Sequence, residues 1–151
     1  MYTTILTLHS WVRWLVLLGG VAATLAAVLD KPAATGGRAD RFGLVFMMAA
    51  DVQMLLGLLL YLVLSPFTAE AFKNFGLAMQ DPKLRFWAVE HITMMLIAVI
   101  LIHVGRVLAR KAGTPASRRT RQIACFGFAT LLMLAGTPWP GMPNGRPLFR
   151  F

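Results

Sequence analysis

Residues 86 to 105 read FWAVEHITMMLIAVILIHVG, and only Glu90, His91 and His103 in this stretch are ionisable. About 20 apolar residues are enough to cross a bilayer as a helix. Three more stretches have the same character, at about residues 5–29, 42–64 and 120–137. Because each is separated from the next by polar residues, glycine and proline, we predict an all-α fold. It is an integral membrane four-helix bundle, with spans at about 5–29, 42–64, 86–108 and 120–137 in one transmembrane domain, residues 1–151.

The composition excludes an ordinary soluble domain. The chain is 58% hydrophobic and only 14% charged, with a mean hydropathy of +0.67, whereas a soluble domain carries about a quarter charged residues. The first apolar stretch follows no basic residue and is too long for the core of a signal peptide. We therefore expect it to be a retained span. A single cysteine, Cys125, excludes an intramolecular disulfide.

The net charge of +9 is distributed unevenly. Nine basic residues lie on the side of the connections between spans one and two and between spans three and four, and five lie on the other side. The nine are Lys31, Arg38, Arg41, Arg106, Arg110, Lys111, Arg118, Arg119 and Arg121, and the five are Lys73, Lys83, Arg85, Arg146 and Arg150. The positive-inside rule predicts that both termini are on the non-cytoplasmic side. The basic clusters indicate topology and lipid contacts, not a nucleic-acid site.

The other segments are short. Phe72, Phe75 and Met79 recur at helical spacing, which predicts a short amphipathic helix at about 68–79 on the membrane surface. The glycine-containing connection at 30–38 is expected to be flexible. The proline-rich tail, 139–151, is expected to have no regular structure.

Two histidines have matching positions. His9 lies four residues into the first span and His91 five residues into the third, so at about 1.5 Å per residue their depths agree. Two imidazoles on facing helices at one depth can hold a b-type haem. The pair predicts that His9 and His91 bind the haem iron, while His103 lies about 18 Å deeper than His91. A histidine that only hydrogen-bonds within the bundle is the alternative.

Cations lie near these histidines. Arg13 follows His9 by one helical turn, and Arg85 lies at the start of the third span. Both are predicted to bind the haem propionates, because guanidinium groups pair well with carboxylates. In the alternative interpretation, Glu90 pairs with Arg13 or Arg85.

Asp51, Glu90 and His103 are secondary polar candidates. A carboxylate in the middle of a span is costly, so Asp51 is expected to have a partner. His103 is the basic group at comparable depth, and an Asp51–His103 interaction would reduce the cost. Structural contact between helices and a proton or quinone site are both open.

These motifs together resemble those of a family of small bacterial four-helix membrane proteins described as cytochrome-b-like. The motifs are Leu8-His9-Ser10-x-x-Arg13-Trp14, Leu84-Arg85-Phe86-Trp87-x-x-Glu90-His91, Gly105-Arg106 and Pro138-Trp139-Pro140. The resemblance covers nearly the whole chain and implies a multi-pass protein of the bacterial inner membrane. Members of the family commonly carry histidine at the position of Asp51, two residues before Gln53, so this chain departs from the pattern there.

The sequence therefore predicts an electron-transfer subunit of a respiratory or photosynthetic membrane complex, with haem b between spans one and three. It would have no catalytic activity of its own and would exchange electrons with other subunits or quinol. The alternative is a cofactor-free accessory subunit that packs against a larger complex and lipid. A small transporter using Asp51, Glu90 and His103 is a third hypothesis, disfavoured by the absence of inverted repeats and broken helices.

Overall fold

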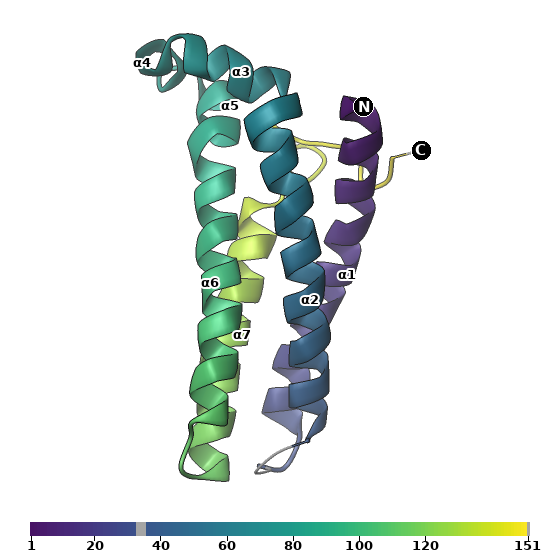
Figure 1. Cartoon of the computed structure of the whole chain (residues 1–151), viewed down its shortest axis with the longest axis vertical. Helices are drawn as coiled ribbons and strands as arrows, with labels where there is room; N and C mark the ends of the chain where they lie inside the picture. Colours follow the sequence, from purple (N-terminus) through teal and green to yellow (C-terminus); the bar gives the residue numbers. More distant parts are fainter. Residues whose placement is uncertain (33–35, 151) are drawn as a thin grey trace.

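The computed structural model describes residues 1–32 and 36–150, and within them every regular element is helical. Four long helices lie side by side, as Figure 1 shows: α1 (Tyr2–Leu29), α2 (Arg38–Leu59), α6 (His91–Arg110) and α7 (Pro115–Gly136). Both chain termini lie at one end of the bundle, which we call the terminal end. The connections before α2 and before α7 lie at the opposite end, the loop end. The connection predicted to be flexible includes residues 33–35, outside the described residues.

Three segments are long and apolar enough to cross a membrane. They are Tyr2–Leu29, Arg38–Leu64 and Pro82–Arg110. The second consists of α2 and the π-helical turn η1 (Leu60–Leu64), and the third of α5 (Pro82–Arg85), the π-helical turn η2 (Phe86–Glu90) and α6. The all-helical fold is thus confirmed, and the three segments are consistent with a membrane protein. The α7 helix is not among the three, because its first two turns carry Arg118, Arg119 and Arg121.

Helices begin earlier than the apolar stretches that predicted them. The third segment begins at Pro82, where Asp81 accepts hydrogen bonds from the Lys83 and Leu84 amides. Similarly, α7 begins at Pro115 after Thr114, whose hydroxyl accepts from an amide in the first turn. Capped first turns beginning with proline are stable although they are polar. The hydrophobic pattern therefore did not predict these polar first turns as part of the helices.

The segment predicted as one amphipathic helix at 68–79 forms two helices instead. They are α3 (Pro66–Lys73) and α4 (Phe75–Ala78), separated by Asn74. The Asn74 backbone is not helical, and its side chain accepts a hydrogen bond from the Leu77 amide. Asparagine favours such local bonds over a helix interior. Both helices project sideways from the terminal end (Figure 1) and expose Phe72 and Phe75.

The tightest packing lies in the middle and towards the loop end. Phe46, Ile102 and Phe126, from α2, α6 and α7, are fully buried. The Phe46 and Phe126 rings meet edge to face with centroids 6.2 Å apart. These side chains join the α1–α2 pair to the α6–α7 pair.

A buried polar cluster ties the loop end together. The Asp40 carboxylate of α2 accepts from the Arg118 guanidinium at 2.6 Å and from the Gln122 amide at 2.7 Å. Arg118 also donates to the Ala109 carbonyl near the end of α6. This network joins α2, α6 and α7.

Two more arginines bind the carbonyl groups at helix ends. Arg119 donates to the carbonyls of Ala27 and Val28, and Arg121 donates to the carbonyl of Leu108 at 2.6 Å. The last carbonyls of a helix have no partner within it, and cations are favourable there. Basic residues that served as topology signals in the sequence thus also fasten the ends of α1 and α6.

Candidate functional site

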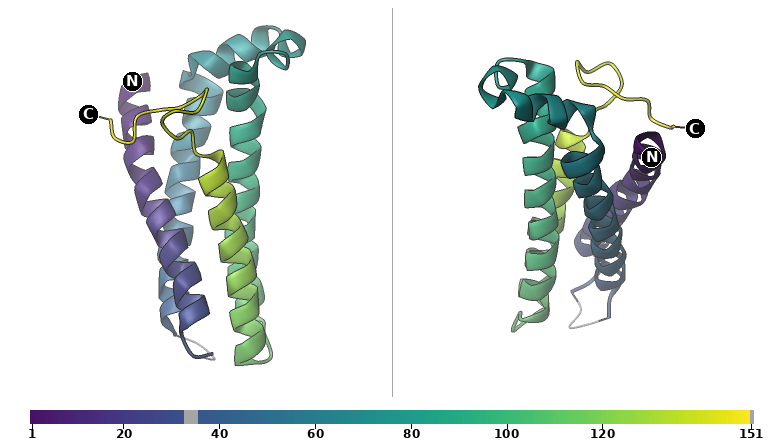
Figure 2. Two further views of the ribbon diagram at one scale, coloured as in Figure 1. Left: turned by 180° about the vertical axis from the view of Figure 1, so that it is seen from behind. Right: turned by 45° about the horizontal axis from the view of Figure 1, so that its top comes forward.

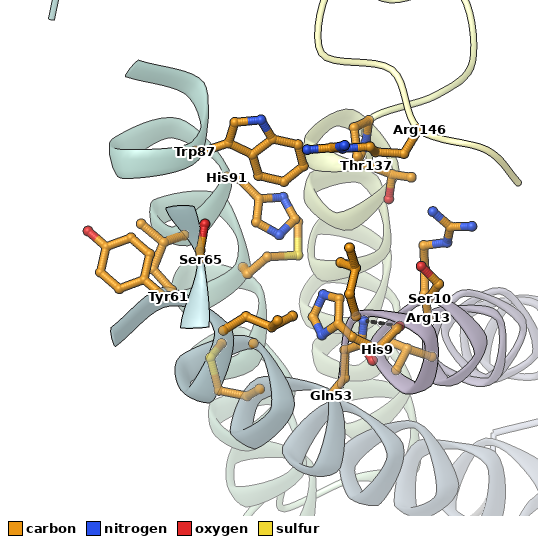
Figure 3. A pocket seen from close by; sticks show the side chains of 18 of the residues that line it. His9, Ser10, Arg13, Gln53, Tyr61, Ser65, Trp87, His91, Thr137 and Arg146 are labelled. Carbon is orange, nitrogen blue, oxygen red and sulfur yellow. Dashed lines mark hydrogen bonds between the residues drawn. The ribbon is translucent and has the colours of Figure 1, made fainter. Parts of the chain in front are cut away.

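A cavity lies between the four long helices towards the terminal end (Figure 3). Its volume is about 130 Å³. All four helices, the segment after η1 and the C-terminal tail line it, mostly with apolar side chains. His9 from α1 and His91 from α6 both line this cavity, as the sequence predicted for facing ligands.

His91 is held by a hydrogen bond from one side of its ring. Its Nδ1 lies 2.8 Å from the carbonyl oxygen of Gly136 at the end of α7. Because a carbonyl only accepts, Nδ1 carries the proton and donates. The Nε2 atom then bears the lone pair, which is the form of histidine that binds a metal.

His9 lies against α2 at a glycine. A Cβ atom added to Gly57 would lie 3.2 Å from Cε1 of His9, tighter than ordinary contact, so the absence of a side chain makes room for the imidazole. The Gln53 amide donates to the backbone carbonyl of His9 at 3.0 Å. Within the described residues, the buried Nδ1 of His9 and Oε1 of Gln53 make no hydrogen bond of normal geometry.

Unpartnered polar atoms concentrate in this cavity. The structure has six buried side-chain nitrogen or oxygen atoms that lack a hydrogen-bond partner among the described residues, and five belong to side chains lining the cavity. They are His9 Nδ1, Arg13 Nε, Gln53 Oε1, Trp87 Nε1 and Arg150 Nε. Buried polar groups are normally paired, and each exception calls for an explanation. Such a concentration indicates a site for a ligand with polar groups.

The tail brings cations to the mouth of the cavity. Residues 137–150 form neither helix nor strand, as predicted, and they cross over the start of α1 (Figure 2). Arg13 donates to the Leu148 carbonyl at 2.6 Å, as does the Trp14 indole at 3.1 Å. With the tail held in this way, Arg146 and Arg150 line the cavity together with Arg13. Figure 3 shows Arg146 beside Trp87, whose ring centroid is 5.0 Å from the guanidinium carbon.

Two π-helical turns shape the wall beside His91. The Tyr61 hydroxyl in η1 donates to the Ala88 carbonyl in η2 at 2.7 Å. The Thr68 hydroxyl donates to the Tyr61 carbonyl at the same distance. Single π-helical turns are rare and frequently occur at functional sites. Here η2 ends immediately before His91, and Tyr61 also lines the cavity.

Arg85 and Glu90 do not line the cavity. Arg85 forms an ion pair with Glu90 at 2.7 Å, and it also donates to the Met79 carbonyl. Both side chains are more than 40% exposed. The structure therefore gives Arg85 a partner other than a cavity ligand. Arg146 and Arg150 in the tail, which the sequence analysis did not assign to the site, are the cations that accompany Arg13.

Asp51 and His103 lie together but outside the cavity lining. The carboxylate Oδ1 of Asp51 is 3.4 Å from Nε2 of His103, the pairing that the sequence suggested. Asp51 itself does not contribute to the cavity. Its neighbour Ala50 and the nearby Gln53 do.

The cavity brings together two imidazoles and three arginines in a mostly apolar lining. Among the described residues, no group of three or more histidine, cysteine or acidic side chains could hold a metal ion by itself. A haem iron needs only two axial protein ligands, because the porphyrin supplies the others. The unpaired cavity atoms, the available Nε2 of His91 and the three arginines therefore fit haem.

Comparison with protein-family models, with curated proteins and with solved structures gave no match.

Proposed function

We propose that this protein is a b-type cytochrome-like electron-transfer subunit of a respiratory or photosynthetic membrane complex. Its haem b would lie between α1 and α6 and would be held by His9 and His91. The observation that carries the proposal is that two imidazoles from different helices enter one cavity. When bound, the haem would supply reversible one-electron transfer.

Each imidazole has a support that would orient it. The Gly136 carbonyl accepts from Nδ1 of His91 and so directs Nε2 towards the ligand. Gly57 admits the His9 ring beside α2, and Gln53 holds the backbone of His9. A histidine fixed before ligand binding loses less entropy when it binds.

The arginines at the mouth would bind the two haem propionates. Arg13 comes from α1, whereas Arg146 and Arg150 come from the tail. A propionate at the mouth would satisfy the buried Nε atoms of Arg13 and Arg150, which have no other partner among the described residues. Met95, Val99 and Met133 line the cavity and would exclude water from the porphyrin.

We further propose that α7 also crosses the membrane, that both termini face the non-cytoplasmic side, and that the membrane is the bacterial inner membrane. The charge asymmetry of the connections supports this orientation. A periplasmic reporter fused after the last residue should be active, and a cytoplasmic reporter inserted at Gly113 should be active. The reverse pattern would contradict the orientation.

The protein would transfer electrons without catalysing a substrate reaction of its own. Its electrons would come from other subunits or from quinol and pass to another subunit, with lipid around the remaining surface. Within residues 1–32 and 36–150, the regular elements are all helices.

The test is the visible absorption spectrum of protein purified in detergent from haem-replete cells. We expect a Soret band that sharpens on dithionite reduction, with the α and β bands of six-coordinate low-spin haem. His9→Ala and His91→Ala should remove or convert this spectrum, whereas the matched control His103→Ala should retain it. Folded but colourless wild-type protein would contradict the cytochrome proposal and favour the cofactor-free accessory subunit.

A further inference from the structure

A polar pair lies on the outer surface of the bundle at mid-height. Asp51 of α2 is thirteen residues from each end of the segment Arg38–Leu64, which is about 20 Å of helix on either side. Its carboxylate faces His103 of α6 at 3.4 Å. The side chains of Asp51 and His103 are 41% and 45% exposed. His103 lies seven residues, about 10 Å, before the end of α6 at Arg110.

The pair has hydrogen-bonding capacity that the chain does not use. Nδ1 of His103 lies 3.0 Å from the Val99 carbonyl, so it donates there, and Nε2 faces the Asp51 carboxylate. The separation of 3.4 Å is longer than a normal hydrogen bond between nitrogen and oxygen. Within the described residues, the Asp51 carboxylate has no closer partner and its Oδ2 atom has none. A carboxylate left in this way against lipid is costly.

The apolar surroundings follow the same spacing on both helices. Relative to Asp51 on α2 and to His103 on α6, exposed large apolar side chains lie at the same three positions. These positions are seven residues before, three residues before and four residues after. They are Leu44, Met48 and Leu55 on α2, and Leu96, Ile100 and Val107 on α6. This spacing gives one continuous stripe on each helix. Asp51 and His103 thus lie among exposed apolar side chains of α2 and α6.

We infer that this face binds the same face of a second copy of the chain, with Asp51 and His103 of the two copies hydrogen-bonded across a two-fold axis. A two-fold interface is self-complementary, so a patch with one acceptor and one donor side by side can meet its own image. With Nδ1 donating to Val99, the donor is the Nε2–H of the imidazolium form, and each carboxylate gains this donor from the other copy. Polar side chains that bond across helices stabilise association in lipid, where apolar surface alone gives little drive.

Cysteine cross-linking in membranes tests the face itself. In a Cys125→Ala background, Met48→Cys and Ile100→Cys place thiols on it. Leu18→Cys on α1 and Leu131→Cys on α7 are matched controls, because these leucines are equally exposed on other faces. A short bis-maleimide should give homodimers at the first two positions and not at the controls. Equal yields at all four positions, monomer only, or cross-linking to a different protein would overturn the inference.

Exchanging the charges tests the chemistry across the interface. Asp51→His alone gives each copy two imidazoles, and His103→Asp alone gives two carboxylates. Each substitution should lower the Met48→Cys homodimer yield about tenfold, since like groups meet across the axis. Co-expression of the two variants should restore cross-linking between unlike chains. Size-exclusion profiles report whether each variant is folded. The inference would be overturned if neither substitution changed the homodimer yield. It would also be overturned if co-expression of two folded variants did not restore cross-linking.

Discussion

The two ends of the bundle differ in how their side chains are packed and how their polar groups are paired. Towards the loop end, Phe46 and Phe126 are fully buried and the carboxylate of Asp40 is satisfied by Arg118 and Gln122. Towards the terminal end, the same helices leave a cavity in which, within the part of the chain that the structure describes, five side chains carry buried atoms without a hydrogen-bond partner. The difference indicates that one half stabilises the fold, which allows the other half to keep polar groups available for a ligand.

The largest effect is expected from emptying the packed half. Phe126→Ala should cost about 3–5 kcal/mol, because it leaves a cavity among side chains that are fully buried. The control Phe128→Ala removes a ring that is 63% exposed on the same helix and should cost much less. Thermal unfolding of both variants in one detergent measures the difference. Equal losses would show that the core does not carry the stability.

A smaller loss is expected when the buried charge pair is broken. Asp40→Asn should cost about 3 kcal/mol, because Arg118 stays buried without a carboxylate partner. Asp30→Asn, whose partner Arg38 is exposed, is the matched control and should cost less. Denaturant titration compares the variants. A larger loss for Asp30→Asn would refute the structural function of the Asp40 cluster.

Two identical substitutions compare the halves directly. A Cβ atom at Gly20 would lie 2.6 Å from the Thr130 hydroxyl and 2.9 Å from the Phe46 ring, so Gly20→Ala should destabilise the protein by about 1–2 kcal/mol. Gly57→Ala should leave stability nearly unchanged but displace the His9 imidazole, lowering haem content. Unfolding and haem per protein are measured for both. If Gly57→Ala lowered stability and Gly20→Ala lowered only the haem content, the division into a packed half and a binding half would be wrong.

The smallest effect is expected at Tyr61. Tyr61→Phe removes the hydroxyl that binds the Ala88 carbonyl and should cost about 1 kcal/mol. Because this bond supports the turn before His91, we also expect a small shift of the reduced α band. Thr120→Val, at a hydroxyl bonded only to its own helix, is the control and should not move the band. An unchanged α band in Tyr61→Phe would show that the π-helical turns do not influence the site.

Several parts of this fold could be predicted from the sequence because membrane helices are defined by local composition. The apolar stretches located the long helices. The similar depths of His9 and His91 in their spans predicted that the two side chains face each other, and both line one cavity. The Asp51–His103 contact followed from the cost of an isolated carboxylate. Each of these inferences needs only helix rise and the energetics of burial.

Other parts depend on the path of the chain between helices. Arg85 and Arg146 are both basic residues at the same end, and the sequence pattern favoured Arg85 because it adjoins the third span. The structure pairs Arg85 with Glu90, while the irregular tail brings Arg146 to the cavity. Proline-rich segments have no periodicity from which such a path can be inferred. The break at Asn74 was similarly hidden, since apolar spacing continues across it.

The central claim is that the cavity at the terminal end binds haem through His9 and His91. Electron paramagnetic resonance of the oxidised, purified protein tests it most directly, because the signal reports the axial ligands of ferric haem. We predict a low-spin signal of bis-imidazole type in the wild type, replaced by a high-spin signal or lost in His91→Ala. A wild-type protein that is folded and gives no haem signal, or a low-spin signal that survives both His9→Ala and His91→Ala, would contradict the account.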